Sequence, residues 1–297
     1  MFIVKNRKIW YALSGIVMAA SIFAIFFFGL KQGIEFTGGS LLEAEYKNTR
    51  PETAVLQEAA GELGLGNVII QPSGEKGIIV RAKELNEEEH QRLLAGFSSK
   101  GELAEIRFDS IGPTIGKELR QKSITAIIMV IVAIVLYIAF AFRKVSRPVS
   151  SFKYGLITVA ALAHDVVIPT GVFAYLGKYY GVEIDALFIT ALLTILGFSV
   201  HDTIVVFDRV RENIKISKQG EDFEQTVGSS VSQTIGRSIN TSLTVVLVLL
   251  ALYFFGGEST KYFSLALIIG VVVGTYSSIF IASPLLATVY KRQDRKK

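Results

Sequence analysis

The sequence of 297 residues contains no cysteine. Without thiols it can form no disulfide, no thiolate metal site and no dithiol redox centre. A phosphate-binding loop is not expected near the N-terminus either, because the pair Gly38-Gly39 is not followed by the Lys-Ser/Thr pair that such a loop requires. The residues therefore indicate neither thiol chemistry nor a phosphate loop, and we expect no metal and no cofactor.

Apolar residues make up 51% of the chain, and the mean hydropathy is +0.46. Several apolar runs are about 20 residues long, which is the length that crosses the hydrocarbon core of a bilayer as a helix. This composition predicts a polytopic α-helical membrane protein.

The net charge of +5 is unevenly distributed. Residues 31–120 hold 11 basic and 15 acidic residues, whereas the rest of the chain holds 20 and 11. The basic excess therefore belongs to the loops that flank the apolar runs, and it does not indicate nucleic-acid binding.

Six apolar runs are predicted to span the membrane. The first, at about 9–29, is longer than the 7–15-residue core of a signal peptide, so we expect an uncleaved span. The others lie at about 121–142, 152–176, 184–207, 238–256 and 262–290. This divides the chain into residues 1–30 with the first span, a domain at 31–120, a five-helix region at 121–290 and a basic tail at 291–297.

Basic residues in the short loops determine the expected orientation. The loops on one side hold only Lys178 and Lys261. We expect that side to face outward, with residues 31–120, and both termini to be cytoplasmic. The cytoplasmic side would then hold Arg143, Lys144, Arg147, Lys153, Arg209, Arg211, Lys215, Lys218, Lys291, Arg292, Arg295, Lys296 and Lys297.

The domain at 31–120 alternates strand-like and helix-like segments in the order βαββαβ, which predicts an α+β ferredoxin-like fold. We expect Pro51 in a first helical turn, a Pro-Ser-Gly turn after residue 71, and His90 on the surface of the second helix. The strands are expected at 41–46, 67–71, 76–82 and 102–111, and the helices at 51–63 and 86–97.

Two acidic residues lie inside apolar runs. Asp202 is separated from the water-exposed Asp208 by the apolar turn 204–207. A charge at the centre of a span costs roughly 2.5–3.5 kcal/mol on insertion scales, so we interpret Asp202 as functional rather than solvated near a helix end. Asp165 lies four residues before Pro169, whose missing N–H frees a backbone carbonyl. Asp165 is either a second functional acid or hydrogen-bonded to neighbouring hydroxyls.

The fifth apolar run is preceded by Arg237. Asn240, Thr241 and Thr244 follow on the same helical face. An arginine at the end of a span can simply extend to the interface. The polar stripe instead favours a face that looks into the helix bundle, toward Asp202.

Glycines flank the domain at 31–120, in GIEFTGGS (33–40) and FDSIGPTIGKELR (108–120). Glycine permits tight backbone turns, and we expect a hinge where the domain meets the membrane. The candidate hinge residues are Gly33, Glu35, Phe36, Gly38, Gly39, Gly112 and Pro113.

Two further patterns concern packing. Small residues at four-residue steps in the last run predict close helix contact, within the chain or with a partner, before a kink at Pro284; they are Gly270, Gly274, Ser278 and Ala282. Apolar residues at the same spacing in 223–235 predict an amphipathic cytoplasmic helix beside the membrane.

The two glycine stretches and HDTIVVFDRVREN at 201–213 together resemble the SecD/SecF family of bacterial protein export, in its smaller, SecF type of subunit. The resemblance covers the whole chain in order, with six spans. Two positions depart from the family pattern, because Glu35 stands where Asp is more frequent and His201 where Asn is common. It therefore stays open whether His201 carries a proton or replaces an amide.

This resemblance implies an accessory function in protein export, driven by the proton gradient across a bacterial inner membrane. The implied partners are SecD, the SecYEG channel, the unfolded exported polypeptide and membrane lipid. It also implies that Arg237 belongs to a proton relay with Asp202, in which Asp165 and His201 are further candidates.

Two other functions are compatible with the residues. A half-size exporter of the resistance-nodulation-division type would move a lipid or small molecule with the same proton logic, and its outer domain would contain an aromatic-lined pocket. A non-conducting assembly scaffold would use its buried charges only for pairing.

Cysteines introduced into this cysteine-free chain test the orientation. A cysteine at Thr53 is expected to react with a membrane-impermeant thiol reagent from outside, and one at Lys218 only from the cytoplasmic side, because basic loops remain inside. Labelling of both positions from the same face of sealed vesicles would refute this topology.

Overall fold

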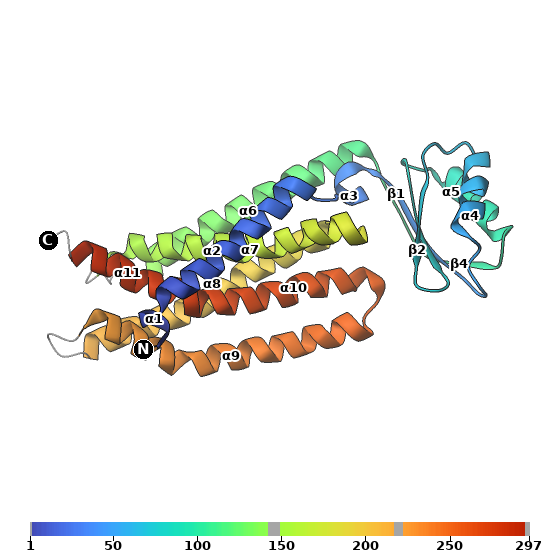
Figure 1. The fold of residues 1–297 in the computed structure, drawn as a ribbon. Coiled ribbons are helices and arrows are strands. Elements are labelled where there is room, and N and C mark those ends of the chain that lie inside the picture. The colour runs from blue at the N-terminus through green and yellow to red at the C-terminus, as the bar shows by residue number, and fades with distance from the viewer. Residues whose placement is uncertain (1, 142–148, 217–221, 295–297) are drawn as a thin grey trace. The chain divides into compact units, whose positions relative to one another are not determined.

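The computed structural model describes residues 2–141, 149–216 and 222–294 (Figure 1). The chain forms two compact units: a helical unit, Met1–Lys31 with Thr125–Lys297, and a sheet unit, Gln32–Ile124. Several basic residues used to predict the orientation lie outside the described residues, namely Arg143, Lys144, Arg147, Lys218, Arg295, Lys296 and Lys297.

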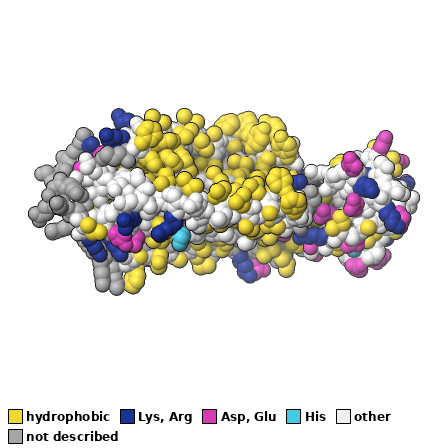
Figure 2. Space-filling model, turned by 90° about the horizontal axis from the view of Figure 1, so that it is seen from below, with side chains coloured by type: hydrophobic (Ala, Val, Ile, Leu, Met, Phe, Trp, Pro, Cys, Tyr) yellow, Lys and Arg dark blue, Asp and Glu magenta, His cyan; other side chains and the backbone are white. Residues whose placement is uncertain are grey.

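Six helices within the described ranges are long and apolar enough to cross a membrane, which confirms the predicted polytopic α-helical class. Figure 2 shows apolar side chains over the middle of the helical unit, and lysine and arginine side chains near the end where the chain termini lie. After a short α1 (Phe2–Lys5), the helices are α2 (Arg7–Phe28), α6 (Pro113–Ala141), α7 (Ser151–Tyr180), α8 (Ala186–Ile216), α9 (Phe223–Phe255) and α10 (Glu258–Ser277) with its continuation.

Several helices extend beyond the apolar runs that predict them. α6 begins at Pro113, which suits a first helical position because no N–H donor is needed there. α8 continues through the charged stretch 208–216, which contains neither proline nor glycine. Hydropathy detects only the apolar part of such a helix, so its polar turns are missed.

The segment 223–235 is not a separate helix beside the membrane, as we expected, but the first part of the 33-residue α9. Asp222 caps this helix by accepting a hydrogen bond from the backbone N–H of Glu224 at 3.1 Å. Only Gly236 could weaken the junction, and a single glycine does not stop a helix. Phe223 and Val227 are buried in the core of the helical unit, which explains their four-residue spacing.

The last span packs through small residues against α8 of the same chain. An added Cβ at Gly274 would lie 3.0 Å from the Cβ of Ser199, and one at Gly270 would collide with Ile195. Ser278 and Ala282 are fully buried. The predicted small-residue stripe is therefore a packing face within the chain.

The chain departs from α-helical geometry just before Pro284. Residues Ser278–Ala282 form a π-helix, η1, which leads into α11 (Ser283–Asp294). The backbone N–H of Ser283 bonds to the carbonyl of Ser278, and its hydroxyl donates to the same oxygen at 2.8 Å. π-helical turns are frequent at functional sites.

The sheet unit has the predicted order of elements, and its four strands form an antiparallel sheet in the order β2-β3-β1-β4. This topology is consistent with a ferredoxin-like fold. The elements are β1 (Gly39–Tyr46), α4 (Thr53–Glu62), β2 (Ile69–Ser73), β3 (Gly77–Ala82), α5 (Glu87–Ser98) and β4 (Leu103–Ile111).

Both helices of the sheet unit cover the same face of the sheet. Alternate residues of β1, such as Leu42 and Tyr46, form a core with Leu56 of α4 and Phe97 of α5. The Tyr46 hydroxyl donates to the carbonyl of Phe97 at 3.2 Å, and burial raises the pKa of Tyr46 to about 12.

Two local predictions about prolines in this unit are wrong. Pro51 precedes α4, whose N-cap is Glu52, instead of lying in its first turn. Pro72 pairs with Ile78 inside β2, and the turn follows at Gly74, where φ is +59°. β2 is an edge strand, so the missing N–H of a proline is tolerated there.

His90 is buried, with 4% of its surface exposed, and is not a surface residue. Its ring stacks on Phe108 at a centroid distance of 3.6 Å, and Nε2 lies 3.3 Å from Oε2 of Glu105. The polar residues around His90 in sequence concealed its position. His90, Leu93 and Phe97 form the inward face of α5 at helical spacing.

The contact of α2 with α7 requires glycine at position 171. An added Cβ there would lie 2.5 Å from both Cα and Cβ of Ser21. Gly171→Ala is therefore expected to lower the free energy of unfolding of the purified protein by about 1–3 kcal/mol through overpacking. Gly155→Ala, on the same helix with nothing within 4 Å of the new methyl group, is the matched control and should be neutral or slightly stabilising. Equal stability of the two variants would contradict this packing.

Candidate functional site

Asp202 of α8 is 3% exposed, so it is buried in the bundle rather than solvated near a helix end. The hydroxyl of Ser238 on α9 donates to Oδ1 at 3.1 Å. Oδ2 has no hydrogen-bond partner among the described residues. A carboxylate can accept about four hydrogen bonds, so Asp202 is the under-satisfied acid of this site.

Asp165 of α7 is completely buried and well satisfied. It accepts hydrogen bonds from the hydroxyl of Ser277 at 2.7 Å, from Nδ1 of His164 at 2.9 Å, and from the hydroxyl of Ser199. The carboxylate thereby joins α7, α8 and α10. Of the two interpretations of Asp165, this geometry favours hydrogen bonding to neighbouring hydroxyls, and a relay role stays a prediction.

The two acids belong to one buried polar band. Ser199 and Asp202 are neighbours on one face of α8, because they are three residues apart. On α10, Thr275 shares a hydrogen bond with Ser242 of α9, and the adjacent Tyr276 bonds to Ser14 of α2 at 2.9 Å. Hydroxyl groups therefore connect five helices around the two carboxylates.

The sequence-based predictions did not include these hydroxyl residues. Serine and threonine are common in membrane helices and carry little signal alone. Their spacing could have identified them, because Ser238 and Ser242 are four residues apart on one face of α9. Thr275 and Ser277 lie between Gly274 and Ser278 of the small-residue stripe.

The polar stripe that begins at Arg237 does not face the bundle of this chain. Arg237, Asn240, Thr241 and Thr244 are all exposed on its surface. Successive helical residues are rotated by about 100°, so the next residue, Ser238, points to Asp202 instead. His201 is also exposed, next to Asp202. Arg237 and His201 thus lie on the surface beside the Ser238–Asp202 hydrogen bond.

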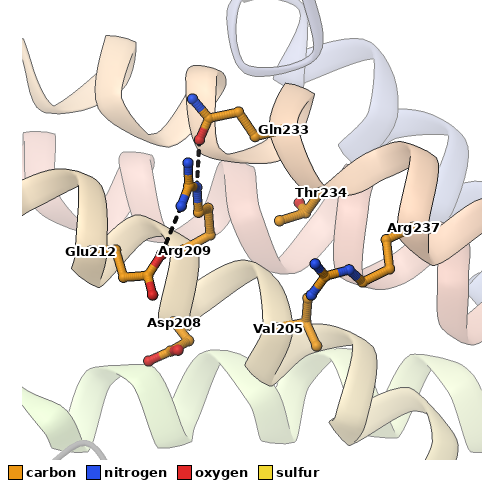
Figure 3. Close-up of a pocket in the computed structure, with 7 residues that line it drawn as sticks. All are labelled: Val205, Asp208, Arg209, Glu212, Gln233, Thr234 and Arg237. Carbon is orange, nitrogen blue, oxygen red and sulfur yellow. Dashed lines mark hydrogen bonds and ion pairs between the residues drawn. The ribbon is translucent and has the colours of Figure 1, made fainter.

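A cavity of about 500 Å³ lies between α8 and α9 (Figure 3). Arg209 crosses it and bonds to Glu212 at 2.8 Å and to Gln233 at 2.6 Å, while the guanidinium of Arg237 extends toward Val205. Its lining is Val205, Asp208, Arg209, Glu212, Gln233, Thr234 and Arg237. The cavity brings Arg237 near polar groups of α8, but Asp202 is not part of its lining.

The candidate hinge residues are clustered in the sheet unit. Gly33 caps the short helix α3 (Ile34–Thr37), which contains Glu35 and the buried Phe36. Gly38 has a φ of +76°, and an added Cβ would lie 2.7 Å from Cα of Pro113. Backbone contact between the two glycine stretches therefore requires glycine. Rotation about these residues stays a prediction.

Six spans with a small α+β unit inserted after the first, and two acids buried in the bundle, define a polytopic membrane protein with a polar core. The family model for the C-terminal part of the protein export membrane protein SecD/SecF matches residues 93–292, and the SecD/SecF GG motif matches 23–49. The chain belongs to the SecD/SecF family of protein export membrane proteins.

Similar proteins place the chain in the SecF branch of this family. Protein translocase subunit SecF of Thermobaculum terrenum is 46% identical over 300 residues, which are 96% of this chain and 93% of the relative. SecF of Synechocystis sp. is 37% identical over 95% of this chain and 92% of its own length. These names identify a transport component and confirm the resemblance found from the motifs, against the exporter and scaffold alternatives.

Two solved structures similar to this chain are also SecDF proteins. SecDF from Thermus thermophilus, described as a translocon-associated membrane protein, has a TM-score of 0.84 and is 32% identical over 97% of this chain. The present chain covers 38% of that SecDF chain. A SecDF structure in a super-membrane-facing form has a TM-score of 0.70 and 31% identity.

Asp165 accepts more hydrogen bonds than Asp202, so substitution of the two acids is expected to lower stability by different amounts. Asp165→Ala removes three hydrogen bonds to a buried carboxylate and is expected to destabilise the protein by about 3 kcal/mol or more. Asp202→Ala removes one accepted hydrogen bond and should cost only about 1 kcal/mol. Thermal unfolding of the two purified variants measures the difference, and a larger loss at Asp202 would contradict this assignment.

Proposed function

We propose that the protein works with SecD to use the proton gradient for late translocation and release of secreted proteins through the SecYEG channel. It acts as a transport component without a catalytic centre or a cofactor of its own. Family membership supports the export role. The observation that carries the proton coupling is Asp202, a carboxyl group buried among membrane spans, one oxygen of which has no partner among the residues that the structure describes.

Asp202 takes up and releases a proton in each cycle. A buried carboxyl group exchanges protons when its surroundings change between states, and a nearby guanidinium favours the ionised form. Arg237 lies one residue from Ser238, the hydrogen-bond partner of Asp202. A small rotation or shift of α9 would therefore alter the distance between Arg237 and Asp202, with His201 on the same surface as a further proton carrier.

SecD covers the surface that carries Arg237 and His201. Exposed polar and charged groups on a membrane span are unfavourable in contact with lipid. A protein partner with membrane spans of its own removes that contact. The SecDF chain similar to this one extends well beyond the aligned part, which leaves room for such spans.

The sheet unit is the extracytoplasmic part of a bacterial inner-membrane protein whose termini are cytoplasmic. It binds unfolded exported chain, and its orientation changes with the proton cycle. A proton that crosses the membrane yields about 2.3 kcal/mol per 100 mV, which is several times thermal energy. The existence of a solved SecDF structure in a differently named form supports motion in the family.

Substitution of Asp202 tests the proton coupling. Asp202→Asn is expected to abolish the response of export to the proton gradient, because an amide cannot take up and release the proton, while the amount of assembled protein stays the same. Arg237→Lys keeps the charge but loses the planar guanidinium, so its effect should be intermediate. Release of a secreted precursor from inverted membrane vesicles, with and without a gradient, is the measurement.

Asp208→Asn is the matched comparison on the same helix. Asp208 is partly exposed and pairs with Arg211 at 2.9 Å, so its neutralisation should reduce export much less. If the Asp202→Asn protein responds to the gradient like the unmodified one, the proton-relay proposal is wrong. Loss of export without a gradient as well would instead indicate damage to assembly.

A further inference from the structure

The ends of three spans meet in a basic cluster near the chain termini. Arg7 begins α2, Glu224 lies in the first turn of α9, and Lys291 belongs to the last turn of α11. Nη2 of Arg7 lies 3.0 Å from Oε1 of Glu224, and Nζ of Lys291 lies 3.3 Å from the same oxygen. Two cations from different helices therefore share one carboxylate oxygen.

Positive charge exceeds negative charge in this cluster. Arg292 is a third cation, which follows Lys291 in the last turn of α11. Asp222 is exposed and is used in capping α9. Among the described residues, Glu224 is the acid that pairs with Arg7 and Lys291, and one carboxylate cannot neutralise both of these cations and Arg292.

Two donors in this region are buried without an acceptor. Nη1 of Arg7 has no hydrogen-bond partner within the described chain, although Nη2 of the same guanidinium does. Nε1 of Trp10, one turn farther along α2, is in the same situation. Buried donors of proteins are nearly always paired, so two of them on one helix face indicate a missing acceptor.

The location favours an acceptor that belongs to a lipid. Leu13 lies three residues after Trp10, on the same face of α2, and is 47% exposed, so apolar surface adjoins the unpaired indole donor. Tryptophan and tyrosine, here Trp10 and Tyr11, are typical of the boundary between lipid chains and water. Acyl chains can cover this apolar surface while a headgroup reaches the cations.

We propose that Arg7, Lys291 and Arg292 bind the phosphate group of an anionic phospholipid at the membrane boundary. Phosphate oxygens accept the hydrogen bonds that a guanidinium and an ammonium donate, and basic pockets between spans on the cytoplasmic side bind such headgroups. The lipid joins the ends of α2, α9 and α11, and Glu224 limits its affinity by competing for the same cations.

Lipid binding to the purified full chain in neutral detergent tests this site. Phosphatidylglycerol is the probe, phosphatidylcholine the neutral lipid and inorganic phosphate the soluble anion, with bound molecules counted by native mass spectrometry. Lys291→Gln and Arg7→Gln are each expected to weaken phosphatidylglycerol binding roughly fivefold. Lys178→Gln, which removes an exposed cation in the last turn of α7, is the control and should leave it unchanged.

Glu224→Gln separates a lipid site from a purely structural ion pair. Loss of the competing carboxylate should strengthen phosphatidylglycerol binding roughly fivefold, even if the variant is less stable. Unchanged binding in Lys291→Gln and Glu224→Gln would overturn the proposal. Equal binding of inorganic phosphate would also overturn the lipid assignment, as would displacement of the lipid by an acidic peptide that binds more tightly to the same cations.

Discussion

A carboxylate buried between membrane helices must find hydrogen-bond donors, and the donors that Asp165 finds determine how the bundle packs. Ser199 and Ser277 come from different helices, so α8 and α10 must approach α7 closely. Glycine at position 274 permits that approach, because a methyl group there would press on Ser199. The π-helical turn that begins at Ser278 follows directly after the residue that holds Asp165. Helix spacing, small residues and irregular backbone therefore have one common cause.

Asp202, one turn after Ser199 on α8, is not satisfied in this way. Within the described chain it accepts one hydrogen bond, and its second oxygen has no partner there, which is unfavourable in a static structure. The site therefore combines a fixed acid that stabilises the bundle with an incompletely satisfied acid that is available for exchange. Rigidity at Asp165 gives the neighbouring carboxyl group a defined position from which a proton can be transferred.

Much of this arrangement could be predicted from the sequence, because the signals were local. Apolar length predicts the spans, and the apolar turn 204–207 between Asp202 and Asp208 predicts a buried Asp202. The failures at His90 and at Arg237 involve partners distant in the chain. His90 looked exposed because its neighbours in sequence are charged, whereas Phe108 covers it in the fold. The stripe at Arg237 was expected to face the bundle, but it is exposed, and Ser238, one residue on, faces Asp202 instead.

The contact between Gly38 and Pro113 has a mechanical consequence for the sheet unit. The segment that enters the unit and the segment that leaves it touch through backbone atoms, and this contact lies outside the sheet. A shift of the start of α6 toward β1 would push directly on the backbone before that strand, because no side chain lies between the two segments. The entry to β1 therefore cannot stay in place when the first turn of α6 moves in that direction.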